Sequence, residues 1–392
     1  MSQKKNPSNE SFSQDSVDAF RKSIFDSFSD VNDPRILTSA IRHELIHIFF
    51  IALCAILCGA NQIKEIAVYA KEREKWLSTV LKLPYGVPSY STFWLTFAML
   101  DPTEFQKGFS KWITHLVELT AGEVYAIDGK ALRGTALKGK PNSFVHMVSL
   151  WACSQQLTLG QVKVDSKSNE ITAIPKLLEM MDIAGTTITI DAMGTQTAIA
   201  DQIIEGGGDY VLALKGNQSS LHDEVCNFFE QAERIDFEGV KHELYHMVEE
   251  GHGRFEKRTF YVTEDINWIP EVKRWRGLKS IILLISERTV DGKTSVERRM
   301  HISSLPADAQ RIAYAIRSHW GIESCHWTLD VGFQEDSLKA RAGNIAENLS
   351  MVRKMALALL KQDKKTNGGI ELKRKKAGWN PDYLLELMGI KF

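Results

Sequence analysis

The chain has 392 residues, of which 44% are hydrophobic and 25% charged, a length and composition that exclude a disordered polymer, a collagen-like fibre and a membrane protein. Its 48 Lys and Arg residues stand against 49 Asp and Glu residues, for a formal net charge of −1. This balance excludes a surface that is basic throughout, so any binding of nucleic acid has to depend on local patches.

The polar N-terminal tail and the most apolar stretch predict neither a signal peptide nor a membrane-spanning helix. Residues 1–24 are rich in Ser, Asn, Gln and Lys and lack an apolar core, which predicts a flexible tail rather than a signal peptide. The most apolar stretch, 46–60, is shorter than the roughly 20 residues that a membrane-spanning helix needs, so we expect a buried helix and no membrane partner.

The cysteine pattern indicates a reducing compartment. The cysteines are odd in number and include no C-x-x-C pair, which argues against a disulfide framework and against a cysteine-rich zinc site. This pattern fits a cytoplasmic location. The five cysteines are Cys54, Cys58, Cys153, Cys226 and Cys325.

The first part of the folded chain is predicted to be helical and the second to be a mixed sheet. Apolar residues recur at close to 3.6 spacing within 25–118, which predicts an α-helical N-terminal domain. Within 119–225, short β-rich runs alternate with helical stretches, the pattern of a mixed α/β sheet. The expected strands are 124–127, 145–153, 157–164, 186–190 and 210–214, with helices at 170–181 and 195–205.

The remainder divides into three parts. Residues 226–305 predict a β-rich insertion, because alternation starts at His242 and Asp291-Gly292 is typical of a hairpin turn. Helices are expected again over 306–362. A basic C-terminal segment, 363–392, closes the chain, and residues 361–376 hold seven Lys or Arg against two acids, which fits duplex DNA or an ordinary solvated tail.

Two H-E-x-x-H sequences raise the question of a zinc site. His43 and His47 are expected on one face of a helix, the arrangement that binds zinc in metalloproteases. That helix is strongly apolar and offers no defined third ligand, so a packing pair is favoured over a zinc protease. His242 and His246 fall in an alternating stretch without helical spacing, and we interpret that match as a coincidence.

A near match to the phosphate-binding P-loop lies at 134–140. The next residue is Pro141 instead of the Ser or Thr that would hold magnesium, and no strand leads directly into the loop. A nucleotide hydrolase is therefore excluded.

Two aspartates follow near-continuous apolar strands. Asp128 follows 124–127 and Asp191 follows 187–190. A single Asp at a strand end is more often a turn former or a helix cap, but two predict a pair of carboxylates at corresponding edges of one sheet. Oxygen ligands of this kind suit Mg²⁺ or Mn²⁺.

A third acid is expected from the helix at 308–330. His319, Glu323, Trp327 and Asp330 follow i, i+4, i+8, i+11 spacing and therefore share one helix face. The alternative for this segment is a salt-bridged packing face.

With these residues in place, the chain resembles the DDE-type transposases of bacterial insertion sequences, in the branch that includes the H-repeat-associated proteins of Rhs elements. The resemblance runs from about Asp33 to the end. It is carried by residues 126–130 with 133–134, 167–171, 189–196, 209–218, 251–254, and 319–323 with 329–331.

The resemblance implies an α/β fold: a ribonuclease H-like mixed sheet core with an all-β insertion, preceded by an α-helical N-terminal domain. It implies that Asp128, Asp191 and Glu323 are catalytic and bind Mg²⁺ (or Mn²⁺), two ions per active site. Such a pair activates a water or a DNA 3′-hydroxyl and stabilises the leaving oxygen. Asp330 stands where a DNA-contacting lysine is expected, which leaves its role open.

The implied partner is double-stranded DNA, both the element ends and the target, bound by a homo-oligomer that assembles on the DNA. Each candidate DNA contact, taken alone, is more often an ordinary surface residue. The candidates are Lys130, Arg133, Lys215, Asn217, Arg254, Tyr314 and Arg317. A helix that opens at Pro88-Ser89 is a weaker candidate for reading the element ends.

The expected function is therefore that of a DNA transposase that cleaves and rejoins the ends of its insertion element. Two alternatives stay open: a metal-dependent nuclease that does not join strands, and a catalytically silent DNA-binding remnant.

Overall fold

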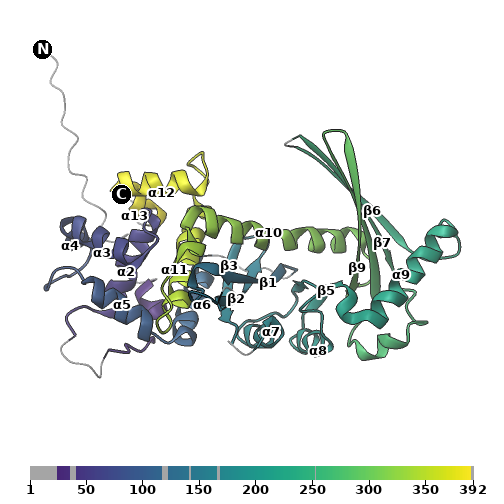
Figure 1. The fold of residues 1–392 in the computed structure, drawn as a ribbon, viewed down its shortest axis with the longest axis horizontal. Coiled ribbons are helices and arrows are strands. Elements are labelled where there is room, and N and C mark those ends of the chain that lie inside the picture. The colour runs from purple at the N-terminus through teal and green to yellow at the C-terminus, as the bar shows by residue number, and fades with distance from the viewer. Residues whose placement is uncertain are drawn as a thin grey trace, which may run out of the picture. The chain divides into compact units, whose positions relative to one another are not determined.

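The computed structural model describes residues 24–35, 41–116, 122–140, 143–165, 168–251 and 253–389 (Figure 1). The tail expected at 1–24 lies outside the described residues except for its last position. The helices are α2 Leu45–Leu57, α3 Ile63–Glu72, α4 Glu74–Val80, α5 Tyr90–Met99, α6 Pro102–Leu116, α7 Glu170–Glu179, α8 Thr197–Glu205, α9 Ser219–Arg234, α10 Ala309–Phe333, α11 Ile345–Gln362, α12 Ile370–Trp379 and α13 Pro381–Leu387. The strands are β1 Val124–Leu132, β2 Val145–Ala152, β3 Leu157–Lys163, β4 Thr187–Ile190, β5 Asp209–Leu214, β6 Glu243–Gly251, β7 Arg254–Thr263, β8 Ser280–Val290 and β9 Lys293–Ser303. Short 3₁₀ turns are η1 Arg133–Thr135, η2 Gly216–Gln218, η3 Pro270–Arg274 and η4 Glu335–Ser337.

The chain forms two compact units, which confirms the predicted class of a mixed α/β fold with an N-terminal helical region. The helical unit comprises 1–118, 131–145 and 326–392, and the sheet unit comprises 119–130 and 146–325. Both β1 and α10 run from one unit into the other, so α10 belongs to the sheet unit up to Cys325.

Two apolar helices form the centre of the helical unit. Every residue of α2 from His47 to Leu57 is buried, as a helix that is hydrophobic on all sides requires. Its partner α11 is buried over most of its length. The apolar stretch is thus the buried helix that the sequence predicts, and no helix in the described part of the chain is long and apolar enough to cross a membrane.

Basic residues of α12 close the C-terminal end of α2. Arg374 is buried, and its guanidinium donates to the carbonyl oxygens of Ile56 at 2.7 and 2.9 Å and of Ala60 at 2.9 Å. Carbonyl groups at a helix end lack partners within the helix, and a cation there also favours the helix dipole. Burial lowers the pKa of Arg374 to about 10. Part of the basic segment therefore holds the fold together.

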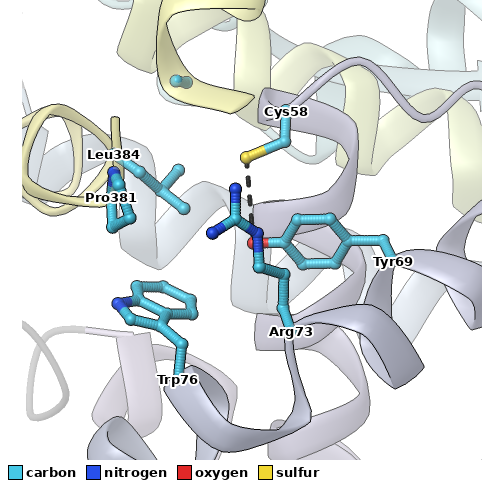
Figure 2. A pocket seen from close by; sticks show the side chains of 7 residues that line it. Cys58, Tyr69, Arg73, Trp76, Pro381 and Leu384 are labelled. Carbon is cyan, nitrogen blue, oxygen red and sulfur yellow. Dashed lines mark hydrogen bonds between the residues drawn. The ribbon is translucent and has the colours of Figure 1, made fainter. Parts of the chain in front are cut away.

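A second contact joins α12 and α13 to α3 and α4. Figure 2 shows Cys58, Tyr69 and Arg73 converging beside Trp76, with a hydrogen bond of 3.7 Å between the Cys58 thiol and the Tyr69 hydroxyl. Arg73 donates to the carbonyl of Gly378 at 2.6 Å. The side chains fill this seam and leave no space for a water molecule, so it is a packing contact.

Among the described residues, the sheet unit has nine strands in the order β3-β2-β1-β4-β5-β9-β8-β7-β6. The neighbours β1, β4 and β5 are parallel, while β2 and β3 form an antiparallel hairpin at one edge. The order 3-2-1-4-5 with this mixture of directions is a ribonuclease H-like arrangement. Helices α7 and α8 lie on one face of the sheet and α10 on the other (Figure 1).

The β-rich insertion extends the same sheet. Strand β9 pairs antiparallel with β5, and β8, β7 and β6 follow in antiparallel order. Asp291 and Gly292 have φ angles of +49° and +73°, as the two central residues of a type I′ hairpin turn require. Residues 280–284 of β8 are buried and the following ones increasingly exposed, so the strands continue beyond the core as a ribbon.

Two sequence expectations are corrected at the residue level. The helix at the first H-E-x-x-H begins only at Leu45, so His43 lies outside it and the expected shared helix face does not form. The expectation that no strand leads into the P-loop-like segment 134–140 is wrong, because β1 continues to Leu132, two residues before Gly134. Gly134 itself packs closely in the helical unit, since a Cβ there would lie 2.2 Å from the carbonyl oxygen of Asp336. The second H-E-x-x-H lies along β6, as expected, where Glu243 accepts a bond of 3.0 Å from the first N–H of α10, that of Ala309.

Candidate active site

The register of two parallel strands brings the two predicted aspartates together. Strand β1 pairs with β4 from Val124 opposite Thr187 to Ile127 opposite Ile190. Asp128 and Asp191 each follow the last of these pairs directly, so they lie side by side where the two strands separate. The sequence predicted Asp128 at a strand end, whereas β1 continues to Leu132 and carries Asp128 within it.

The backbone fixes both carboxylates. Oδ1 of Asp191 accepts N–H bonds from Met193 at 3.1 Å and from Gly194 at 3.3 Å. Gly194 allows the tight turn, because a Cβ there would come within 2.3 Å of the Ile190 side chain. Oδ1 of Asp128 accepts the N–H of Gly129 at 2.8 Å. Each aspartate is thus oriented by its own loop before any ligand arrives.

The electrostatics of Asp191 show that negative charge accumulates here. Burial raises the pKa of Asp191, and the charges of Asp128 and Glu170 raise it further, against the lowering effect of the Gly194 N–H and of His319. Neighbouring carboxylates that oppose one another's ionisation form a site that a cation stabilises.

The third predicted acid arrives on α10. Thr189 lies two residues before Asp191 and therefore points to the same side of the sheet. Its Oγ1 is 2.9 Å from Nδ1 of His319. Glu323 is exposed and follows His319 by one helical turn. Burial lowers the pKa of the His319 imidazole. The charges of the three predicted acids act against that shift, so all of them lie within electrostatic reach of this ring.

The donor set fits a divalent metal ion. Asp128, Asp191 and Glu323 supply only carboxylate oxygens, the ligands that Mg²⁺ and Mn²⁺ prefer. In the described part of the chain, no three His, Cys, Asp or Glu side chains already stand together as a metal site. Mg²⁺ is usually held by one or two carboxylates together with substrate phosphates, so a pair of aspartates is a donor set that suits it.

Three predicted DNA contacts lie close to this edge of the sheet. Lys130 is buried on β1, two residues after Asp128. Lys215 and Asn217 are exposed in the loop after β5, the parallel neighbour of β4. Nδ2 of Asn217 donates to the carbonyl of Ala192 at 2.6 Å, which ties this loop to the one that carries Asp191.

The other predicted contacts lie on α10, β7 and η1. Arg317 pairs with Glu249 of β6 at 3.3 Å, and Tyr314, one turn earlier on α10, is 52% exposed. Arg254 begins β7, a strand of ten residues, and lies about 30 Å from the buried end of that strand at Thr263. Arg133 and Asp330 belong to the helical unit.

A further basic cluster was missed by sequence reasoning. The guanidinium groups of Arg258, Arg299 and Arg317 lie 5.1, 5.3 and 5.2 Å from the ring of Trp320. We call these four residues the arginine–tryptophan cluster. Trp320 precedes Glu323 by three residues on α10, so the cluster lies next to the predicted site. The only sequence signal was the unusual Trp-rich helix, because β7 and β9 supply the other arginines from distant segments.

The comparisons with known proteins cover almost the whole chain. Residues 119–359 match the family model described as Transposase DDE domain, and residues 25–113 match the model described as DDE_Tnp_1-associated. YncI of Escherichia coli O157:H7 is 40% identical over 94% of this chain and 94% of that protein. YhhI of Escherichia coli (strain K12), described as H repeat-associated, is 34% identical over 94% of this chain and 98% of that protein.

The names of both relatives assign them to the transposases. Among solved structures, the piggyBac transposase in a synaptic complex with hairpin DNA matches with a TM-score of 0.44 and 12% identity, over 96% of this chain and 79% of that chain. So loose a structural likeness supports no statement about this chain. The two family models and the extent of the sequence matches decide its identity: the chain belongs to the family of transposases with a DDE domain.

Proposed function

We propose that this protein is a metal-dependent DNA transposase that cleaves the ends of its insertion element and joins them to target DNA. Asp128, Asp191 and Glu323 are proposed to hold two Mg²⁺ or Mn²⁺ ions. The observation that carries the proposal is the β1–β4 register, which sets two backbone-oriented carboxylates side by side at one sheet edge.

When bound, two divalent ions activate the attacking oxygen and stabilise the leaving oxygen of a phosphodiester displacement. The chain's own residues would hold the ions and keep the carboxylates in position. Asp128 and Asp191 are fixed by backbone N–H groups, and Glu323 is proposed to complete the set from α10, one helical turn after His319. Burial lowers the pKa of His319, and the contact of its Nδ1 with the Thr189 hydroxyl links α10 to β4.

DNA is proposed to reach the site along the basic residues around it. Lys130 follows Asp128 by two residues, Lys215 and Asn217 lie in the loop after β5 that contacts the loop of Asp191, and Trp320 of the arginine–tryptophan cluster precedes Glu323 by three residues. Hydrogen bonds from Arg317 and Arg258 hold the pKa of Glu249 below its usual range in spite of its partial burial. Phosphates that replace Glu249 as the partner of these arginines would be contacted in pairs, the geometry that guanidinium groups favour. Arg133, Arg254 and Tyr314 are proposed as contacts to more distant parts of the DNA.

Joining two element ends requires two active sites brought together, so we propose a homo-oligomer that assembles on DNA. The proposed location is the cytoplasm.

The proposal is tested by substituting each acid separately. Asp128→Asn, Asp191→Asn and Glu323→Gln are expected to lower the rate of DNA strand cleavage by at least about a thousandfold, because each removes a charge that anchors an ion. Cleavage of labelled DNA with Mn²⁺ or Mg²⁺ measures this, and a gel-shift assay is expected to show that DNA binding is retained. Asp223→Asn, an exposed residue of α9, is the matched control and keeps full activity.

Full cleavage by any one of the three variants would remove that residue from the site. Cleavage by the wild-type protein without any joined product would favour the nuclease alternative. DNA binding without cleavage by a correctly folded wild-type protein would favour the silent remnant.

A further inference from the structure

A fourth carboxylate, that of Glu170, lies beside the proposed metal site. Glu170 is the first residue of α7, and its side chain is only 13% exposed. It lies directly against Gly129: a Cβ built on that glycine would come 2.0 Å from Oε1 of Glu170 and 2.3 Å from its Cδ. The carboxylate of Glu170 therefore occupies the space of a side chain next to Asp128, and Gly129 has to be a glycine.

The two faces of the sheet explain how Glu170 reaches this position. Side chains alternate along a strand, so Thr189 and Asp191 share the face that α10 covers, as the Thr189–His319 contact shows. Ile190 points to the opposite face, where it packs beside Gly194 and α7. Glu323 thus approaches the aspartate pair from one side of the sheet and Glu170 from the other.

His146 fixes the orientation of Glu170. Nε2 of His146, on β2, lies 2.8 Å from Oε1 of Glu170. A histidine that holds a ligating carboxylate is a common outer partner at metal sites, where it sets the direction of the ligand. This contact engages Oε1, so Oε2 is the atom available to a metal ion.

The carboxylate of Glu170 lies against Gly129, the residue that directly follows Asp128. A structural ion pair between His146 and Glu170 alone would not require the carboxylate to lie against the residue after Asp128. This position repels the aspartates unless a cation lies among them.

We propose that Glu170 is a metal ligand of this site, binding one of the divalent ions together with Asp128 or Asp191, and that His146 is a positioning residue that holds Glu170. This inference rests on the proposed function, because it adds a ligand to the same metal site. It gives the segment around Glu170 a chemical role in this chain.

The test is Mn²⁺ binding to the full-length protein without DNA, measured by electron paramagnetic resonance of free Mn²⁺ and by calorimetry. Glu170→Gln is expected to weaken binding by at least about tenfold or to remove one of the bound ions, with unchanged circular dichroism. Glu179→Gln, an exposed glutamate in the last turn of the same helix, is the matched control and binds as the wild type does.

Two further variants separate a ligand from a merely structural residue. Gly129→Ala is expected to weaken Mn²⁺ binding in the same way, because its Cβ displaces the Glu170 carboxylate. His146→Ala is expected to weaken binding about tenfold, whereas His146→Gln, which keeps a donor, restores most of it.

The outcomes distinguish this inference from the proposed function. If Asp191→Asn abolishes Mn²⁺ binding and Glu170→Gln leaves it unchanged, Glu170 is no ligand, and the proposed function stands. If the folded wild-type protein binds no Mn²⁺ and cleaves no DNA, the proposed function fails, and this inference fails with it.

Discussion

At the scale of single residues, burial lowers the pKa of two histidines of the sheet unit, His301 and His319. His301 of β9 is buried, and its Nδ1 has no hydrogen-bond partner among the described residues. Burial lowers the pKa of His301 to about 3, and the charges of Arg299, His319 and Lys215 act in the same direction. The basic residues proposed to meet DNA therefore also oppose protonation of this ring.

The low pKa of His301 predicts a loss of stability in acid. The unfolded chain takes up a proton at this histidine near pH 6.5, whereas the folded protein does so only at about pH 3. The contribution of His301 to stability is fully present above pH 6.5. As the pH falls from 6.5 to 3, this contribution is lost, and the free energy of unfolding decreases by at most about 1.4 kcal/mol per pH unit. His301→Leu removes this pH dependence, so the stability of the variant rises relative to that of the wild type as the pH falls.

Urea unfolding at pH 7.5, 6.0 and 5.0, followed by circular dichroism, measures the difference. Parallel pH dependences of the wild type and His301→Leu would contradict the assignment of a depressed pKa to His301.

The acids of the site could be predicted from the sequence, but several of their partners could not. Asp128 and Asp191 follow apolar strands, and Glu323 lies on a helix with regular polar spacing, so local patterns were sufficient. Arg258 and Arg299 meet at Trp320 only because β7 and β9 lie in one sheet. Glu170 likewise approaches Asp128 through the packing of α7, which no local pattern specifies.

At the scale of elements, a charged pair lies inside the helical unit. Arg353 of α11 and Glu335 of η4 are fully buried, 3.7 Å apart. Arg353 also donates to the carbonyl of Asn61 at 2.8 Å. Burial lowers the pKa of Arg353, although Glu335 acts to raise it. An ion pair in such a place costs much to break, because the remaining charge stays buried.

This pair predicts non-additive mutations. Arg353→Met and Glu335→Leu are each expected to lower the free energy of unfolding by about 3–5 kcal/mol, since each leaves one buried charge without its partner. The double variant is expected to recover much of that loss. Urea unfolding of all four proteins measures the coupling, and additive losses would show that the two charges do not stabilise one another.

Element types followed from the sequence better than element ends did. The buried α2, the hairpin at Asp291-Gly292 and the helix that opens at Ser89 were predicted, and Ser89 caps α5 through its hydroxyl, which accepts from the N–H of Thr92 at 3.2 Å. The start of α2 was wrong because Glu44 makes no side-chain cap that would mark it. Strand β1 was expected to stop at Asp128, but the buried Lys130 and Leu132 continue its alternation.

At the scale of the whole molecule, the net charge of −1 averages over basic residues with different tasks. Some stabilise the fold. Lys373 donates to the carbonyls of Leu360 at 3.1 Å and Asp363 at 2.5 Å, and Arg374 donates to the carbonyl of Ile56 at the C-terminal end of α2. Others surround the proposed site in the sheet unit. The sequence could not separate the two sets, because a run of lysines has the same composition whether it binds DNA or packs against a helix end.

The most direct test of the central claim uses the wild-type protein and the DNA that flanks its coding region. Purified protein with Mg²⁺ or Mn²⁺ is mixed with duplexes that carry the two element ends and with a plasmid target, and the products are sequenced. The account predicts cleavage at the ends and covalent joining to the target, both lost with Asp191→Asn. Folded protein that binds these ends with metal present, but neither cleaves nor joins them, would contradict it.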